Sequence, residues 1–351
     1  MKDVIAAIQD AAASGTRLAV RGHASKHALG GPHGGETLLV SASGITDYQP
    51  SELVITARAG TPLAEVEDLL ATRGQALAFE PPRLAPAPHS GTVGGMVAAG
   101  LAGPARVAAG SLRDHLLGVR MVNGRGEALR FGGTVIKNVA GYDVARLLAG
   151  SWGAIGVITE ASLRVVPLAP AEATLRFALP QDAALAQLAD WASQPLPLNA
   201  SAWWQGTLAV RLRGARAAVA AALAQLARHG GEPIAFEAAQ GFWQGLRDQH
   251  DEFFTHARLE DAAGHARLWR LALPPATPAL ALPGDMLVEW HGAQRWLLTS
   301  APPEAVHAAV RAAQGHARLW WGHTPPAPTA LQQAVQAAFD PHGVFHTQRL
   351  T

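Results

Sequence analysis

The feature that most constrains this chain is a segment of small side chains, SGTVGGMVAAGLAGPARVAAG, from Ser90 to Gly110. More than half of its residues are glycine or alanine, so its backbone can approach another group closely. That group could be a helix, a lipid bilayer or the phosphate of a ligand. The rest of the sequence decides among the three.

Length argues against the bilayer. A transmembrane helix needs roughly 18 consecutive apolar residues, and Pro104 and Arg106 interrupt the segment while Arg113 follows it closely. The N-terminal residues 1–15 place acidic and amide side chains inside an apolar pattern, which predicts an amphipathic helix rather than a signal peptide. We therefore expect a cytoplasmic protein.

Composition limits the chemistry. The length of 351 residues predicts two domains, and 49% hydrophobic residues predict a folded chain. The net charge of +1 lacks the basic excess of a nucleic-acid-binding protein. The sequence contains no cysteine, so this chain cannot itself ligate an iron–sulfur cluster or use a thiolate. Redox chemistry here would need an organic cofactor.

Residues 1–168 alternate helix and strand patterns. One helix is well delimited, with Thr61 as its N-cap, Pro62 at its first position and Gly74 after its end. A hairpin is predicted with its turn at Asn123 and Gly124. The other predicted elements are a helix at 3–14, strands at 17–22 and 37–42, a half-buried strand at 53–59, a short helix at 143–148 and a long strand that ends at 167.

Beyond residue 170 the pattern changes to that of a ferredoxin-like βαββα unit. A second unit follows, and a last helix ends near Asp340. The hexapeptide GHARLW occurs at Gly264 and at Gly315, which we interpret as coincidence because the flanking residues differ. The elements of the two units are expected at 174–179, 182–194, 202–214 and 215–231, and then at 265–273, 286–292, 294–300, 303–315 and 316–322.

Three glycine-rich segments lie where strands end or helices begin: Val20–Lys26, Pro86–Ala102 and Trp152–Ile158. Backbone N–H groups in such loops favour anions. Neither a GxGxxG motif after a strand nor a GxxxxGK[ST] motif occurs, so neither a Rossmann site nor a P-loop is indicated. Each segment alone is more simply a loop or a close helix contact, but the three together predict a long ligand with a diphosphate.

The segments RGHASKHALGG, SGTVGGMVAAGLAGPAR, KNVAGYD, GVITEASLRV and FDPHGVF occur in an order that resembles the vanillyl-alcohol oxidase superfamily, which has a PCMH-type FAD-binding domain. Within it, the sequence is similar to the family of FAD-binding E subunits of bacterial glycolate oxidases. The resemblance is strong over about 15–168 and weaker, though in the same order, beyond.

The resemblance implies an α+β fold, with a PCMH-type FAD-binding domain of two α/β subdomains and a ferredoxin-like α+β cap domain. The FAD-binding domain would span residues 1–168, with subdomains of about 1–80 and 81–168. The cap domain would span 169–323. Residues 324–351 would form a C-terminal segment that returns to the FAD-binding domain.

The resemblance also implies how FAD is held. The first segment would be the pyrophosphate loop, and the third would meet the adenosine. Thr92 would cap the helix that Gly94 and Gly95 let approach closely, and Lys137, Asn138, Gly141 and Tyr142 look like family positions near the flavin. The implied FAD-binding residues are Val20, Arg21, Gly22, His23, Ala24, Ser25, Lys26, Pro86, Ala87, Pro88, His89, Ser90, Gly91, Thr92, Gly94, Gly95, Ala99, Gly100, Leu101, Ala102, Trp152, Gly153, Ala154, Ile155, Gly156, Val157 and Ile158.

The chain departs from the family pattern at three places. The first loop reads GHAS where several glycines are usual, so His23 and Ala24 bring Cβ atoms to the expected position of the phosphate. His23 is a candidate for covalent flavin attachment or, more simply, a loop histidine. FHTQRL replaces an Asn-Pro-Gly turn. Related 2-hydroxy-acid dehydrogenases hold a metal with paired histidines and a glutamate, whereas the histidines here are scattered, so we predict no metal site and assign no catalytic residue.

The resemblance implies an FAD-binding subunit of a multi-subunit glycolate oxidase, which converts glycolate, a small 2-hydroxy acid, to glyoxylate. The implied partners are a second FAD-containing glycolate oxidase subunit, in which substrate oxidation could occur, and an iron–sulfur subunit that passes electrons toward a respiratory acceptor. Contact with the membrane would come only through these partners. Two alternatives remain: a self-sufficient FAD-dependent hydroxy-acid dehydrogenase, and a non-catalytic assembly subunit that kept the fold.

Overall fold

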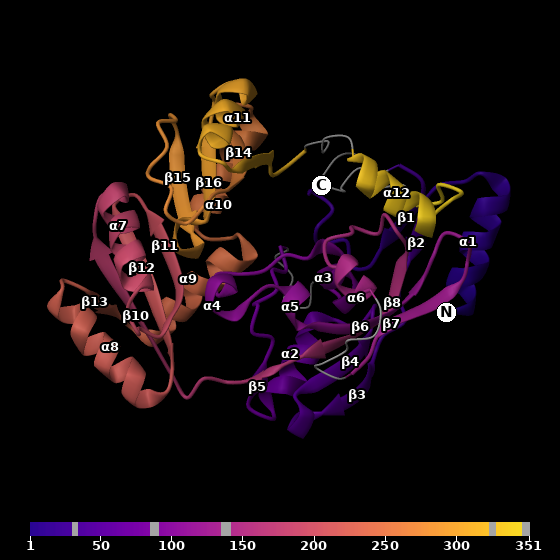
Figure 1. The fold of residues 1–351 in the computed structure, drawn as a ribbon, viewed down its shortest axis with the longest axis horizontal. Helices are drawn as coiled ribbons and strands as arrows, with labels where there is room; N and C mark the ends of the chain where they lie inside the picture. Colours follow the sequence, from indigo (N-terminus) through magenta and orange to yellow (C-terminus); the bar gives the residue numbers. More distant parts are fainter. Residues whose placement is uncertain (30–33, 85–90, 135–141, 323–327, 346–351) are drawn as a thin grey trace. The chain divides into compact units, whose positions relative to one another are not determined.

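The computed structural model describes residues 1–29, 34–84, 91–134, 142–322 and 328–345 (Figure 1). The chain divides into two compact units. Unit 1 comprises Met1–Ala102, Gly110–Leu168 and Gly322–Thr351, and unit 2 comprises Gly103–Ala109 and Ala169–Trp321. Residues 103–109 thus fold with unit 2, although their neighbours on both sides belong to unit 1.

Unit 1 begins with the predicted amphipathic helix α1 (Lys2–Ser14), which buries Ile8 and Ala11. Strands β1 (Leu18–Arg21) and β2 (Glu36–Leu39) pair in parallel. The backbone N–H of Leu18 donates to the carbonyl of Val344 at 2.7 Å. The segment after the last helix, α12 (Ala330–Phe339), is therefore bonded to β1.

The centre of unit 1 is a five-stranded antiparallel sheet that packs against helices. Much of its core comes from β4 (Val54–Arg58), β8 (Val157–Arg164), α2 (Leu63–Ala71) and α3 (Val93–Ala99), which include the buried residues Ile55, Leu163, Leu70 and Met96. The hairpin predicted around Asn123 is confirmed as β6 and β7. In spatial order the strands are β3 (Ile45–Gln49), β4 (Val54–Arg58), β8 (Val157–Arg164), β6 (Leu116–Val122) and β7 (Ala128–Gly132).

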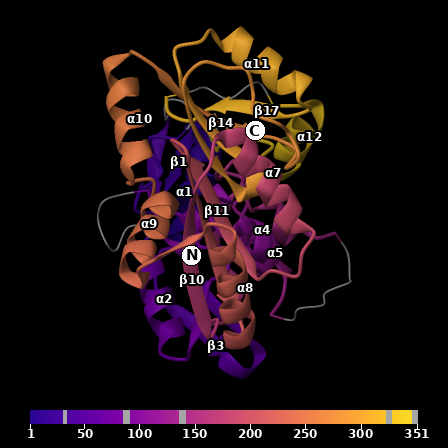
Figure 2. The same cartoon turned by 90° about the vertical axis from the view of Figure 1, so that its left-hand side faces the viewer.

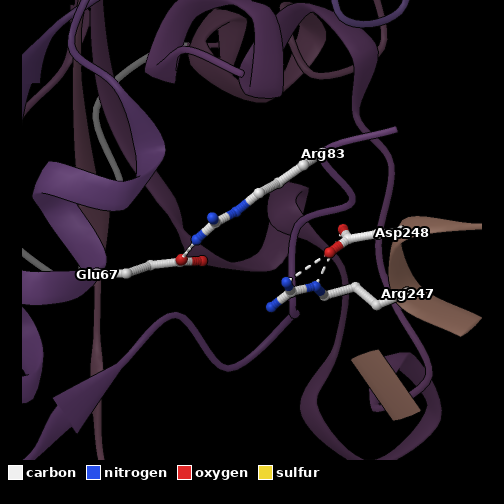
Figure 3. Close-up of polar contacts among 4 residues, drawn as sticks. All are labelled: Glu67, Arg83, Arg247 and Asp248. Atoms are coloured by element: carbon white, nitrogen blue, oxygen red, sulfur yellow. Dashed lines mark hydrogen bonds and ion pairs between the residues drawn. The ribbon is translucent and has the colours of Figure 1, made fainter. Parts of the chain in front are cut away.

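Short elements complete unit 1. The side chain of Arg83 pairs with Glu67 of α2, which ties the segment after β5 to that helix (Figure 3). The remaining elements are η1 (Pro50–Glu52), α2 (Leu63–Ala71), β5 (Gln75–Ala76), α3 (Val93–Ala99), α5 (Leu112–His115), α6 (Val144–Leu147) and β9 (Val166–Pro167).

Three details of unit 1 correct the sequence predictions. Strand β4 was predicted to be half-buried, but four consecutive residues of it are buried. Side chains on one face pack in the core, and on the other face the hydroxyl of Thr56 forms a hydrogen bond with that of Ser162 at 2.9 Å. Thr61 does not cap α2; Pro62 holds that position, and the Thr61 hydroxyl instead accepts the Gly44 N–H at 2.9 Å. Strand β8 ends at Arg164, and the extended chain pairs again only in β9.

Unit 2 is built on one eight-stranded antiparallel sheet that contains two ferredoxin-like halves. Both halves have the same spatial strand order, fourth-first-third-second, and they meet where β11 pairs with β15. The first half is β10 (Ala171–Ala178), α7 (Gln181–Ala192), β11 (Leu198–Trp204), β12 (Thr207–Gly214), α8 (Arg216–Arg228) and β13 (Glu232–Ile234). The second half is β14 (Arg267–Ala272), β15 (Asp285–Glu289), η2 (Trp290–Gly292), β16 (Gln294–Thr299), α11 (Pro303–Ala312) and β17 (His316–Leu319).

The second half replaces the first connecting helix with the loop 273–284. The buried side chain of Arg295 holds this loop in place, because its guanidinium donates to the carbonyls of Gly292, Pro278 and Thr277. The two GHARLW copies lie on β14 and β17, the first and last strands of this same half, which agrees with their interpretation as coincidence.

Helices cover both faces of the sheet in unit 2 (Figure 2). Helices α7, α8 and α11 pack on one face. Helices α9 (Phe236–Asp248) and α10 (Glu252–Ala263), which the sequence analysis did not predict, cover the other, where Trp243 donates to Thr174 at 3.0 Å. At the end of α9, Arg247 pairs with Asp248 at 2.6 Å (Figure 3). Among the described helices, none is long and apolar enough to cross a membrane.

Candidate functional site

A cavity of about 140 Å³ in unit 1 brings the three glycine-rich segments together. Its walls are the loop after β1, the first turn of α3 and the loop before β8. The predicted residues that line it are Val20, Arg21, Gly22, His23, Ala24, Ser25, Lys26, Thr92, Gly94, Gly95, Trp152, Gly153, Gly156 and Ile158.

The other predicted residues are not in this lining. Ala99 and Gly100 end α3, and Leu101 and Ala102 follow it. Ala154 and Ile155 are buried in the core of unit 1, and Val157 packs in the cluster around α1. Gly91 precedes α3 with a φ of +87°. Pro86, Ala87, Pro88, His89 and Ser90, and also Lys137, Asn138 and Gly141, lie outside the described residues, and Tyr142 is exposed.

The loop after β1 consists of tight turns. The N–H of His27 donates to the carbonyl of Ala24 at 3.0 Å, and the N–H of Leu29 donates to Lys26 at 3.1 Å. Ala24 has a φ of +53°, the left-handed conformation that glycine adopts at no steric cost. Ala24 in the GHAS sequence therefore adopts a conformation that favours glycine, at a cost of about 1 kcal/mol for its Cβ.

Gly22 and Thr92 hold the loop against α3. A Cβ at Gly22 would lie 2.6 Å from the Thr92 Oγ1. That oxygen accepts the N–H of Gly95 at 3.2 Å, so the prediction that Thr92 caps α3 is confirmed. A Cβ at Gly94 would lie 2.7 Å from the Cβ of Ala59, so the predicted close approach at Gly94 is also confirmed.

The loop before β8 is held against the same helix. The N–H of Trp152 donates to the carbonyl of Ala98 at 2.9 Å. Trp152, Gly153 and Gly156 all have positive φ, which turns the backbone along the cavity. A Cβ at Gly153 would lie 3.6 Å from Val20, so this loop also meets the end of β1.

The charges of the cavity favour an anion. Lys26 is buried, and its Nζ donates to the Ser25 Oγ at 3.5 Å. Arg21, half-buried at the end of β1, adds a second cation to the lining. Two cations and a hydroxyl beside closely turned backbone suit a group with two negative charges, such as a diphosphate.

Sequence reasoning missed the apolar part of the lining. Val40, Ala59 and Ala98 complete the cavity beside Leu18 and Ala19. Their sequence signal is that of ordinary core residues, so no pattern distinguished them. Among the residues that the structure describes, no group of three or more histidine, aspartate or glutamate side chains is placed to hold a metal ion.

Known proteins are similar to this chain over residues 1–132 and over almost its whole length. Residues 1–132 match the family described as FAD binding domain. Over 350 residues the chain is 42% identical to glycolate oxidase subunit GlcE of Escherichia coli (strain K12). The alignment covers 98% of this chain and 95% of that protein. This chain belongs to the GlcE family. The family resemblance found in the sequence is confirmed, and so is FAD as the cofactor.

Two further similarities concern a shorter segment of the chain and its fold. The chain is 38% identical over 84 residues to glycolate oxidase subunit GlcD of Bacillus subtilis (strain 168), which covers 24% of this chain and 18% of that protein. The structure of an alkyldihydroxyacetonephosphate synthase superposes with a TM-score of 0.62 at 13% identity, and covers 98% of this chain and 73% of that one. The predicted fold class, an α+β chain with a PCMH-type FAD-binding domain, is confirmed, and the GlcE family consists of FAD-binding oxidoreductase subunits.

Proposed function

We propose that this chain is the FAD-binding subunit of a multi-subunit glycolate oxidase and that the diphosphate of FAD lies in the cavity of unit 1. The observation that carries the proposal is the cradle formed by Gly22, Thr92 and Gly94, in which the two glycines approach their neighbours more closely than a Cβ would allow. A glycolate oxidase subunit from the same family supports the activity.

The cavity fits part of FAD. Its volume of about 140 Å³ is below the roughly 300 to 1,000 Å³ of pockets that enclose a whole small ligand. Ser25 and the backbone of 22–26 would hold the diphosphate, with Arg21 and Lys26 balancing its charge. Thr92, Gly94 and Gly95 would form the wall beside it. The lining residues Trp152, Gly153, Gly156 and Ile158 would contact the adenosine half.

When bound, FAD supplies a two-electron acceptor for the oxidation of a 2-hydroxy acid. The contribution of this chain is to bind and orient that group. The Thr92 cap and the left-handed Ala24 fix the two sides of the cradle before the cofactor arrives, so little ordering remains to be done on binding.

We further propose that this chain works with a second FAD-containing subunit and an iron–sulfur subunit. The names of the relatives GlcE and GlcD describe subunits of one kind of oxidase. This chain has no cysteine, so a cysteine-ligated cluster would have to lie in another chain. The complex would work in the cytoplasm, with any contact to the membrane made through its other subunits.

The domain roles are also part of the proposal. Residues 1–168 would form the FAD-binding domain, 169–323 the cap, and 324–351 a segment that returns to the first domain. Residues 103–109 fold with unit 2, so we assign them to the cap.

Purification alone and after co-expression with the products of neighbouring genes tests the function. We expect about one noncovalent FAD per chain, and glycolate-dependent reduction of an electron-accepting dye only by the co-expressed complex. A single chain that reduces its own flavin with glycolate would replace the proposal with the self-sufficient dehydrogenase. A chain that stays colourless with added FAD inside an active complex would replace it with the assembly subunit.

A further inference from the structure

Unit 2 contains a cluster of arginines and tryptophans that the FAD cavity does not use. We call it the Arg–Trp cluster. Its arginines come from three separate segments: α4 (Arg106–Ala109), β14 and β17. Helix α4 lies beside β11, in the same unit (Figure 1). The members of the cluster are Arg106, Arg270, Arg318, Trp290, Trp296 and Trp320.

Arg270 is the centre of the cluster. Its Cζ lies 5.4 Å from the ring centroid of Trp290, 5.8 Å from that of Trp296 and 5.6 Å from that of Trp320. The Cζ of Arg106 lies 4.7 Å from the same Trp290 ring. Arg270 and Arg318 stand directly opposite each other on antiparallel strands. Three guanidinium groups therefore converge on one part of unit 2.

Hydrogen bonds fix the three indole rings. Trp290 donates to the carbonyl of Gly103 at 3.1 Å, and Trp320 donates to Gln249 at 2.7 Å. Trp296 donates to Glu289 at 2.6 Å. The cations thus stack on rings that cannot turn freely, so the cluster is organised in advance for a ligand.

The cluster has more positive than negative charge. Arg270 uses its Nε to bind Gln294 at 2.8 Å, and neither Arg270 nor Arg106 forms an ion pair with a carboxylate among the described residues. Glu289, the acid whose charge acts on Arg270, is 4% exposed and already accepts bonds from Trp296 and Gln294. Burial raises the pKa of Glu289 to about 7, which reduces the negative charge it offers at neutral pH. An added anion would compensate the charges of Arg106 and Arg270.

The backbone beside the cluster is strained. Trp290 and His291 both have a φ of +53°, and Gly292 continues the left-handed run at +96°. Each non-glycine residue in this conformation costs about 1 kcal/mol or more. The hydroxyl of Ser201 accepts the N–H of His291 at 3.0 Å and helps to hold the run. Such strain is typical of binding sites, and here it positions the ring on which Arg106 and Arg270 stack.

We propose that Arg106, Arg270 and Arg318 form a binding site for the carboxylate of a small 2-hydroxy or 2-oxo acid. The planar guanidinium fork matches a carboxylate in geometry and charge. The ligand class rests on the proposed function, but the site adds that this chain itself binds the acid, through arginines. No sequence pattern indicated this site, because Arg106 precedes Arg270 by 164 residues and joins the two strand arginines only in the fold.

Calorimetric titration of the purified full-length chain with glycolate and glyoxylate tests this site. We expect saturable binding of both acids and none of ethylene glycol, the neutral analogue of glycolate. Arg106→Gln and Arg270→Gln should each raise the dissociation constant at least about tenfold, the size expected for loss of one charge-assisted bond. Arg270→Lys should give an intermediate value, because it keeps the charge but loses the fork.

The control is Arg228→Gln, which removes an exposed arginine from α8 of the same unit and should bind like the unmodified chain. Arg106 is exposed, so its variant tests the site even where Arg270→Gln does not fold. Equal affinity in the Arg106 and control variants, no binding of either acid, or tighter binding of inorganic phosphate would each overturn the proposal. FAD content is measured on the same samples. If the chain binds the acids but binds no FAD, the proposed function is refuted and this site is not. If the complex is active but the arginine variants bind the acids normally, this site is refuted and the proposed function is not.

Discussion

Replacement of Gly22 by alanine tests the cradle most sharply. The backbone at Gly22 is compatible with alanine, because its φ is outside the positive range. The added Cβ would nevertheless lie 2.6 Å from the Oγ1 of Thr92 and 3.3 Å from its Cγ2. Either the loop must move away or the hydroxyl must rotate and give up the N–H of Gly95. Overpacking of this kind costs about 2 kcal/mol.

A double-mutant cycle separates this clash from other effects. Thr92→Ala alone removes the cap of α3 and should cost about 1 kcal/mol. The pair Gly22→Ala and Thr92→Ala should also cost only about 1 kcal/mol, because the atoms that clash are gone. The expected coupling is therefore about 2 kcal/mol.

Urea denaturation measures the free energy of unfolding, and the ratio of absorbance at about 450 to 280 nm measures FAD retention. We expect Gly22→Ala to weaken FAD binding at least about tenfold. Gly133→Ala is the matched control, because a Cβ there would meet no atom within 4 Å and its φ is not positive. The close contact between the loop and α3 would not exist as described if Gly22→Ala behaved like this control. The same conclusion would follow if the unfolding free-energy costs of Gly22→Ala and Thr92→Ala simply added in the double variant.

Three further changes have expected outcomes. Ala24→Gly should raise the free energy of unfolding by about 1 kcal/mol in urea, because it relieves a left-handed alanine; no gain would mean that the loop has another conformation. Burial raises the pKa of Glu289 from 4.5 to about 7. The contribution of Glu289 to the free energy of unfolding is therefore complete below pH 4.5 and falls by roughly 3 kcal/mol as the pH rises through 7. Glu289→Gln should therefore lose less thermal stability between pH 5 and 8 than the unmodified chain, and parallel Tm curves would contradict this. Arg295→Met leaves the carbonyls of Thr277 and Pro278 in the loop 273–284, and that of Gly292, without their donor. It should cost about 2 to 4 kcal/mol in urea, whereas a cost under 0.5 kcal/mol would show that Arg295 does not hold the loop.

Much of the fold could be predicted because its signals are local. The helix at the N-terminus, the hairpin at Asn123 and the strands around α11 follow from periodicity and turn residues over short windows. Helix α9 carries a local signal that the sequence analysis missed, because Ala239, Trp243 and Leu246 recur at helical spacing on one face despite Gly241 and Gly245. Helix α10 carries a weaker pattern, and its buried residues Phe253, Phe254 and Ala257 are identified only in the fold.

The candidate site divides in the same way. The loop after β1 and the first turn of α3 could be predicted, since glycine and a capping threonine carry their own backbone requirements. Val40 and Ala98 could not, because they line the cavity only after distant segments meet. The left-handed Ala24 was equally hidden: the sequence indicated a departure from glycine, and the structure retains glycine's conformation with alanine in place.

The flavin content of the purified chain tests the central claim most directly. The chain should be yellow as isolated, or after incubation with FAD, with about one FAD per chain that acid precipitation releases, and Gly22→Ala should lose most of it. A folded chain that remains colourless with excess FAD, or a Gly22→Ala variant that retains a full complement, would contradict the account.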